Sequence, residues 1–267
     1  MNSSLSNAET EELKAFACTL ADAAAEVSLK YFRQPVTVEN KLSDGGFDPV
    51  TQADRGAEKA IRNLIEAQYP NHQIFGEEFG RKITDSPFEW VLDPIDGTRA
   101  FISGLPTWGT LIGLRYNGEP VIGVIDQPYM GERYLGWTTG ATLNGKPIRT
   151  RPCPNLSSAT LSTTDPDLFT GNERPLFDQI LSESKLVRYG MDCYAYAILS
   201  SGFLDVVMES GLELYDMMAL IPVVRGAGGS ASGWSGESPG PSGRLLAVGD
   251  PALAEKLLKI TAAFEHP

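Results

Sequence analysis

Hydrophobic residues recur every three or four positions in two stretches near the start of the chain, which is the spacing of one helix face. Residues 8–33 predict a long N-terminal helix. Residues 54–69 predict a second helix, which ends at a proline. Short apolar runs at residues 73–75 and 89–92 then predict two strands, and acidic residues follow each of them.

Further along, the pattern changes to the alternation of polar and apolar residues that is typical of strands. Residues 110–116 and 121–125 flank an Asn-Gly pair at residues 117–118, which is the strongest short signal for a β-hairpin. Residues 133–136 predict another strand, and a second Asn-Gly pair at residues 144–145 predicts another tight turn.

The second part of the chain alternates strand patterns with helix patterns. The strand patterns cover residues 159–162, 186–189, 206–209 and 245–248, and the helix patterns lie near residues 175–184, 194–201, 216–225 and 251–264. The sequence therefore predicts an α+β half over residues 1–150 and an α/β half over residues 151–267, with a boundary near Arg151. Residues 230–243, rich in Gly, Ser and Pro, predict a loop.

Composition narrows the class of protein. The chain has 267 residues, 42% of them hydrophobic, which is enough for a substantial core. A net charge of −12 argues against binding to nucleic acid or to an anionic membrane, whereas excess carboxylate suits a protein that binds divalent cations. No apolar stretch approaches the roughly 18 residues of a membrane span, and the N-terminus lacks a secretory signal pattern.

The cysteines and histidines also exclude some chemistry. Cys18, Cys153 and Cys193 are widely spaced and odd in number, which indicates reduced thiols and a cytoplasmic protein. Of the two histidines, His266 is the penultimate residue, so His72 is the one histidine expected within the folded core region of the chain. A zinc site of histidines and a Ser-His-Asp triad are therefore not expected, and carboxylates would have to carry out any catalysis.

The strongest candidate for chemistry lies at residues 90–98. An apolar strand ends at Asp93, a proline turns the chain, and Asp96 follows on the same side of the bend. The two carboxylates are expected to share a small hard cation, with the carbonyl of Ile95 as a third oxygen ligand. The alternative is that Asp93 caps a turn and Asp96 caps a helix.

Gly97 and Thr98 come next and are expected to open a helix. Glycine lets the backbone approach a ligand closely, and the free N–H groups of a helix start favour a phosphate. Carboxylates that hold a metal beside such an anion site form the arrangement that phosphoryl hydrolysis needs.

Other acidic residues also stand at the ends of predicted elements. Glu77 and Glu78 follow a strand, Asp216 opens a helix, and Asp48 and Asp54 precede the second helix. Each alone is more commonly a cap or a solvated residue, but together they favour a functional site.

Asp165 and Asp167 suggest a minor alternative, a phospho-aspartyl nucleophile with its acid partner. Residues 161–164 before them are too polar for a buried central strand, and an Asp-Pro turn is the commoner explanation.

Four motifs in this order resemble the inositol monophosphatase family: residues 48–54, 76–78, 90–98 and 213–229. The resemblance implies an α/β fold, a layered α/β/α/β/α sandwich of the inositol monophosphatase and sugar phosphatase type. It also implies a homodimer and Mg²⁺-dependent hydrolysis of small phosphomonoesters through direct attack by water.

The resemblance further implies a ligand set for two or three Mg²⁺ ions. The first ion would be held by Glu77, Asp93 and the carbonyl of Ile95. The second would be held by Asp93, Asp96 and Asp216.

The same resemblance implies the roles of the remaining site residues. Thr98, paired with Asp54, would orient the attacking water, and Glu77 would serve catalysis as well as metal binding. Backbone N–H groups of Gly97 and Thr98 would hold the phosphate oxygens.

Within the family, the chain is most similar to histidinol-phosphate phosphatases, by residues 101–110, 125–128 and 190–196. Asp192 and Glu209 would pair with the positive charge of an amino alcohol, although an N-cap explains Asp192 equally well. Glu213 stands where some such members have a basic residue.

The expected activity is therefore hydrolysis of L-histidinol phosphate in histidine biosynthesis. The alternatives are a phosphatase of inositol 1-phosphate or of small sugar and nucleotide esters, and, from another class, a metal- or phosphate-sensing module without catalysis. The expected partner is a small phosphorylated substrate, with no nucleic acid and no membrane.

Overall fold

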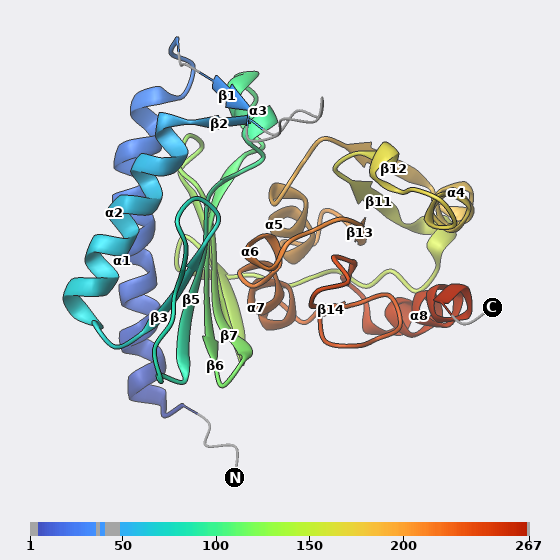
Figure 1. Cartoon of the computed structure of the whole chain (residues 1–267). Coiled ribbons are helices and arrows are strands. Elements are labelled where there is room, and N and C mark those ends of the chain that lie inside the picture. The colour runs from blue at the N-terminus through green and yellow to red at the C-terminus, as the bar shows by residue number, and fades with distance from the viewer. Residues whose placement is uncertain (1–4, 36–37, 41–48, 266–267) are drawn as a thin grey trace.

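The computed structural model describes residues 5–35, 38–40 and 49–265, so Asp48 and His266 lie outside the described residues. Its layers are visible in Figure 1. Helices α1 (Asn7–Tyr31) and α2 (Gln52–Gln68) cover one face of a large sheet, and α5 (Tyr194–Ser200), α6 (Leu214–Met217) and α7 (Leu220–Gly226) cover the other. A second sheet follows, with α4 (Glu173–Glu183) and α8 (Pro251–Glu265) beyond it. The expected α/β/α/β/α sandwich is confirmed.

The first two helices begin at capping boxes. Ser6 accepts the N–H of Glu9 at the start of α1, and Thr51 caps α2 together with Asp54. Because Asp54 is at N3, the fourth and last position of this box, α2 begins two residues before the predicted start. A short ribbon of β1 (Val38–Asn40) and β2 (Pro49–Thr51) leads into α2.

The large sheet has eight strands in the order β10-β9-β8-β7-β6-β5-β3-β4. The strands are β3 (Gln73–Gly76), β4 (Gly80–Lys82), β5 (Phe88–Asp96), β6 (Gly109–Tyr116), β7 (Glu119–Gln127), β8 (Glu132–Trp137), β9 (Gly140–Leu143) and β10 (Lys146–Pro147). Both predicted Asn-Gly turns are present, with positive φ at Asn117, Gly118, Asn144 and Gly145. The sequence pattern did not predict β4.

One pairing in this sheet positions the site. β3 and β5 run parallel, with Gly76 opposite Leu92, so both strands reach the same sheet edge. The prediction that the second strand ends at residue 92 is wrong, because β5 continues to Asp96 with a register shift against β6 between Asp93 and Asp96. That irregularity turns both aspartates toward the edge where β3 ends.

The second sheet has the order β12-β11-β13-β15-β14. Its strands are β11 (Thr160–Thr163), β12 (Leu186–Tyr189), β13 (Val206–Glu209), β14 (Ser230–Ser232) and β15 (Leu245–Val248). The expectation that residues 161–164 are too polar for a central strand is wrong, because buried Ser162 and Thr163 lie in β11 between two partners. The hydroxyl of Ser162 donates to the carbonyl of Arg188, and that of Thr163 donates to Glu209. Both hydroxyls are therefore hydrogen-bonded although they are buried.

Two other predictions for this part need correction. Residues 230–232 form β14 rather than part of a loop. The helix predicted at residues 216–225 is divided into α6 and α7. The remaining short helices are α3 (Thr98–Ile102), η1 (Leu156–Ser158) and η2 (Pro166–Leu168).

Glycines let α7 approach the large sheet closely. A Cβ atom at Gly136 would lie 2.2 Å from Cα of Val223, and one at Gly123 would lie 2.0 Å from the carbonyl oxygen of Ala219. Neither strand has room for a larger residue at these points. The close contact holds α6, which precedes α7, near the end of β5.

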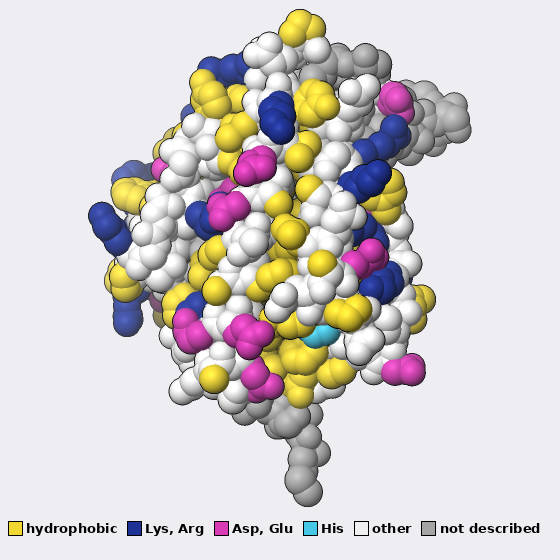
Figure 2. All heavy atoms as spheres, turned by 90° about the vertical axis from the view of Figure 1, so that its left-hand side faces the viewer, with side chains coloured by type: hydrophobic (Ala, Val, Ile, Leu, Met, Phe, Trp, Pro, Cys, Tyr) yellow, Lys and Arg dark blue, Asp and Glu magenta, His cyan; other side chains and the backbone are white. Residues whose placement is uncertain are grey.

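The remaining expectations concern membrane spans, the cysteines and the charge of the surface. Within the described ranges, no helix is both long and apolar enough to cross a membrane. Cys18, Cys153 and Cys193 are all free thiols. On the face formed by α1 and α2, acidic and basic side chains are scattered among hydrophobic ones (Figure 2).

Candidate active site

Three carboxylates meet at the edge where β3 and β5 end. Asp93 and Asp96 come from β5 and Asp216 from α6, and one oxygen of each lies within 4.8 Å of the others. Asp93 is almost fully buried, with 3% of its surface exposed. Residues more than a hundred positions apart in the chain therefore form one acidic cluster.

Glu77 adds a fourth carboxyl group to this cluster. Burial is the main cause that raises the pKa of Asp93 well above its usual range, and the charges of Glu77 and Asp96 add to it. Burial likewise raises the pKa of Asp96 and, well above the usual range, that of Asp216. An all-oxygen set under such mutual repulsion fits a hard divalent cation, which would relieve the repulsion.

The carbonyl of Ile95 lies in the same bend. It accepts a hydrogen bond from the hydroxyl of Thr98 at 3.1 Å, and a carbonyl oxygen has a second lone pair that remains for a cation. The carboxylate of Asp93 accepts the N–H of Ile95 at 3.1 Å, so the alternative that Asp93 caps a turn holds together with its place in the cluster.

Asp54 and Thr98 come together as expected, although 44 residues separate them. Oγ1 of Thr98 lies 3.5 Å from Oδ1 of Asp54. The other oxygen of Asp54 accepts the N–H of Thr51 at 2.9 Å and also its hydroxyl at 2.5 Å. The capping box of α2 therefore fixes the carboxylate that faces Thr98.

Gly97 is the N-cap of α3, with a φ of 79° that favours glycine. A Cβ atom here would lie 2.8 Å from the carboxyl carbon of Asp192. Gly97 therefore permits the close approach of Asp192, while its role in phosphate binding stays a prediction.

The alternative that Asp96 caps a helix is wrong. Its carboxylate accepts the N–H of Cys193 at 2.6 Å, and α3 has no side-chain cap. No local sequence pattern indicated this contact of Cys193, because the hydrogen bond spans 97 residues.

The N-cap explanation of Asp192 is also wrong. The N-cap of α5 is Cys193, whose own side chain makes no capping hydrogen bond. Asp192 instead has a φ of 47° and places its carboxyl group against Gly97. Burial, with the charge of Asp96 next, raises the pKa of Asp192 to about 7 against the opposing effect of Arg99.

Glu209 ends β13 and is buried beside Asp192. Its carboxylate accepts the hydroxyl of Thr163 at 2.9 Å, and the N–H and hydroxyl of Thr164 at 2.7 and 2.9 Å. Burial raises the pKa of Glu209 to about 8, although these hydrogen bonds oppose the shift. The two threonines are partners that the sequence did not indicate.

Glu213 and Asp165 have local structural roles. The N–H of Glu213 donates to Asp216 at 2.7 Å in the capping box of α6, which orients that carboxylate. Asp165 accepts the N–H of Asp167 at 2.9 Å at the start of η2, as an Asp-Pro turn predicts. The described contacts therefore favour the turn over a phospho-aspartyl nucleophile.

The layered fold and the acidic cluster define a class of phosphatase, and the comparison with known proteins identifies it. The sequence profile of the inositol monophosphatase family matches residues 9–265. The chain belongs to this family, whose members are phosphatases and are generally metal-dependent.

Individual relatives carry two kinds of name. The chain is 46% identical over 238 residues to the bifunctional phosphatase IMPL2, chloroplastic, of Arabidopsis thaliana, covering 88% of this chain and 68% of that protein. It is 35% identical to the histidinol-phosphatase of Chlorobaculum parvum, covering 91% and 93%. An inositol monophosphatase structure from Zymomonas mobilis matches with a TM-score of 0.85 and 42% identity, covering 94% and 98%.

Proposed function

We propose that this phosphatase hydrolyses L-histidinol phosphate to L-histidinol and phosphate, with Mg²⁺ as its metal. The observation that carries the substrate proposal is the pair of carboxyl groups beside the acidic cluster. Asp192 touches Gly97, and the charge of Asp192 acts on Glu209. Two acids in a buried position favour a substrate with an ammonium or imidazolium group over one with hydroxyls only.

Bound Mg²⁺ would polarise the phosphoryl group, lower the pKa of water and neutralise the leaving oxygen. Glu77, Asp93, the Ile95 carbonyl, Asp96 and Asp216 would hold two or three such ions. The single hydrogen of the Thr98 hydroxyl faces two acceptors, the carbonyl of Ile95 at 3.1 Å and Oδ1 of Asp54 at 3.5 Å, and the lone pairs of this hydroxyl would accept a hydrogen bond from the attacking water. The N–H groups of Gly97 and Thr98 would face the phosphate oxygens.

A second candidate is a phosphatase of inositol phosphate. The hydrogen bonds of Glu209 with Thr163 and Thr164 favour it, because they already occupy part of the acceptor capacity of this carboxylate. The non-catalytic sensor is less well supported, because Asp54 and Thr98 stand together as a catalyst would require. We further propose a cytoplasmic homodimer, and we propose that each chain divides near Arg151 into a half over residues 1–150 and a half over residues 151–267.

The test is a side-by-side measurement of kcat/KM on L-histidinol phosphate, inositol 1-phosphate, a sugar bisphosphate and a nucleoside bisphosphate. Asp192→Asn should lower the value for histidinol phosphate about tenfold to a hundredfold, because a charge-assisted hydrogen bond contributes about 1.5–3 kcal/mol. Asp178→Asn, on the surface of α4, is the matched control. Equal turnover of inositol 1-phosphate, or no effect of Asp192→Asn, would refute the substrate assignment.

A further inference from the structure

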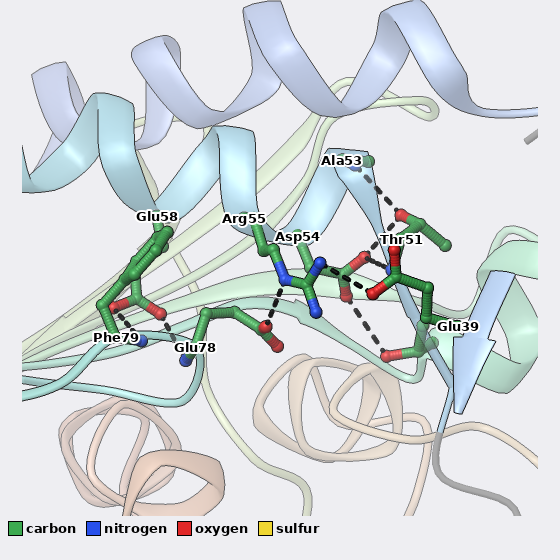
Figure 3. Close-up of polar contacts among 9 residues, drawn as sticks. Glu39, Thr51, Ala53, Asp54, Arg55, Glu58, Glu78 and Phe79 are labelled. Carbon is green, nitrogen blue, oxygen red and sulfur yellow. Dashed lines mark hydrogen bonds and ion pairs between the residues drawn. The ribbon is translucent and has the colours of Figure 1, made fainter. Parts of the chain in front are cut away.

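The turn that carries Glu77 is attached to α2 by a buried carboxylate. Gly76 and Gly80 face each other in the β3–β4 pair, and residues 77–79 form the turn between them. Glu58 of α2 accepts the N–H of Glu78 at 2.7 Å and the N–H of Phe79 at 3.2 Å (Figure 3). One side chain therefore satisfies two successive donors of the turn.

Arg62, one helical turn further along α2, completes this attachment. Its Nε donates to Glu58 at 2.7 Å, and its guanidinium also donates to the carbonyl of Gly80. The side chain of Glu58 is 0% exposed and that of Arg62 is 14% exposed. The pair thus contacts both the donors and an acceptor of the turn in a region that excludes most water.

Gly76 shows how little freedom the turn has. A Cβ atom at Gly76 would lie 2.0 Å from Oε1 of Glu58, so the carboxylate packs directly on the last residue of β3. On the other side, the N–H of Glu77 donates to the carbonyl of Leu92 in β5 at 3.1 Å. The turn is therefore held between β5 and α2, with the carboxyl group of Glu77 beside Asp93.

We propose that Glu58, supported by Arg62, is a positioning residue that sets the metal affinity of the site by fixing the turn of Glu77. The proposal rests on the metal site described under the proposed function. Asp54, Glu58 and Arg62 are four residues apart, so they share one face of α2. The same helix therefore contacts both the hydroxyl of Thr98 and the turn of Glu77.

The variant that tests this is Glu58→Gln, which keeps the size of the side chain. An amide has a single acceptor oxygen, so it cannot serve both N–H groups and Arg62 as the carboxylate does. The dissociation constant for Mg²⁺, measured by calorimetry without substrate, should rise roughly tenfold. This is the lower end of the range of affinity losses seen when a residue that supports a metal ligand is changed. The kcat at saturating Mg²⁺ should change little, and amide exchange in residues 76–80 should become faster.

Asp205→Asn is the matched control. Asp205 is also a buried carboxylate, paired with Arg151 and accepting the N–H of Thr160 at 2.7 Å, but it precedes β13 at the end opposite Glu209. The Asp205→Asn variant should have a lower Tm than the wild type and an unchanged Mg²⁺ dissociation constant. Arg62→Met provides a milder variant, expected to weaken Mg²⁺ binding less than Glu58→Gln.

The outcomes separate this inference from the proposed function. An unchanged Mg²⁺ dissociation constant in both Glu58→Gln and Arg62→Met would overturn the positioning role, and so would an equal change in Asp205→Asn. Weaker Mg²⁺ binding in the two α2 variants alone would support it. Failure to hydrolyse histidinol phosphate with normal Mg²⁺ binding would instead overturn only the substrate proposal.

Discussion

The backbone N–H of Cys193 donates to the carboxylate of Asp96 at 2.6 Å, and this bond joins α5 to β5 beside the acidic cluster. It connects two segments that lie on either side of the proposed boundary near Arg151. A second such connection is Asp216, which α6 brings to the end of β5. The site therefore forms only when the helices between the two sheets are packed in place.

Asp93→Asn should lower kcat/KM by at least about a hundredfold, because even residues that only support metal ligands can matter that much. In the absence of metal the variant should unfold at a higher temperature than the wild type, because burial and the neighbouring charges raise the pKa of Asp93, so folding at neutral pH penalises this carboxyl group and not an amide. Phosphate release and thermal unfolding in chelator measure the two effects. Full activity of the variant, or of the wild type in excess chelator, would contradict the metal site.

Thr98→Val should lower kcat by a larger factor than it changes the Mg²⁺ dissociation constant, because the hydroxyl of Thr98 reaches the metal site only through the carbonyl of Ile95. Valine keeps the shape of threonine but has no hydroxyl to face Asp54 or a water molecule. Steady-state kinetics at saturating Mg²⁺ and calorimetry separate the two quantities. Thr19→Val on α1, which removes only a bond to the carbonyl of Ala15, is the control.

His72 should make stability depend on pH. Its ring stacks between Tyr69 and Phe88, with centroid distances of 4.6 and 4.7 Å, and accepts a hydrogen bond from Trp90 at 3.1 Å. Burial lowers the pKa of His72 below its usual value of 6.5, so the folded state binds a proton less readily than the unfolded chain. The stability that the neutral His72 ring contributes is fully present above the pKa of the unfolded chain. This stability is lost as the pH falls below that pKa.

The measurement is the free energy of unfolding of wild type and His72→Asn from about pH 7.5 to about pH 5.5. Asparagine keeps an acceptor for Trp90 but does not titrate. The wild type should lose more stability on acidification, by up to about 1 kcal/mol. Parallel pH profiles for the two proteins would show that His72 stays uncoupled from folding.

Gly136→Ala should destabilise the protein by about 3 kcal/mol, which is the upper end of the usual cost of adding a group to a packed core. The reason is that the new methyl group would meet backbone atoms of α7. The denaturant midpoint measures this loss. Gly240→Ala is the control, since its Cβ would lie 3.7 Å from the nearest atom, an ordinary contact. An equal, small effect of both substitutions would mean that α7 can move away from β8 without loss.

Short sequence patterns predicted many of the turns, helices and strands of this protein. The two Asn-Gly turns, the long helix α1 and most strands follow from patterns that span a few residues, and such patterns act through backbone conformation alone. The bend of Asp93 and Asp96 is local as well, so the main metal candidate could be recognised before its partners were located.

Other features depend on contacts between distant segments, which no local pattern encodes. Polar β11 is a central strand because Glu209 and a neighbouring strand satisfy its hydroxyls. Asp192 departs from its expected cap position because the packing of α5 holds it against Gly97. Glu58 resembles any helix carboxylate in the sequence, and only the tertiary structure places it under the turn of Glu77, because hydrogen bonds across 20 and 21 residues form only once α2 lies on the sheet.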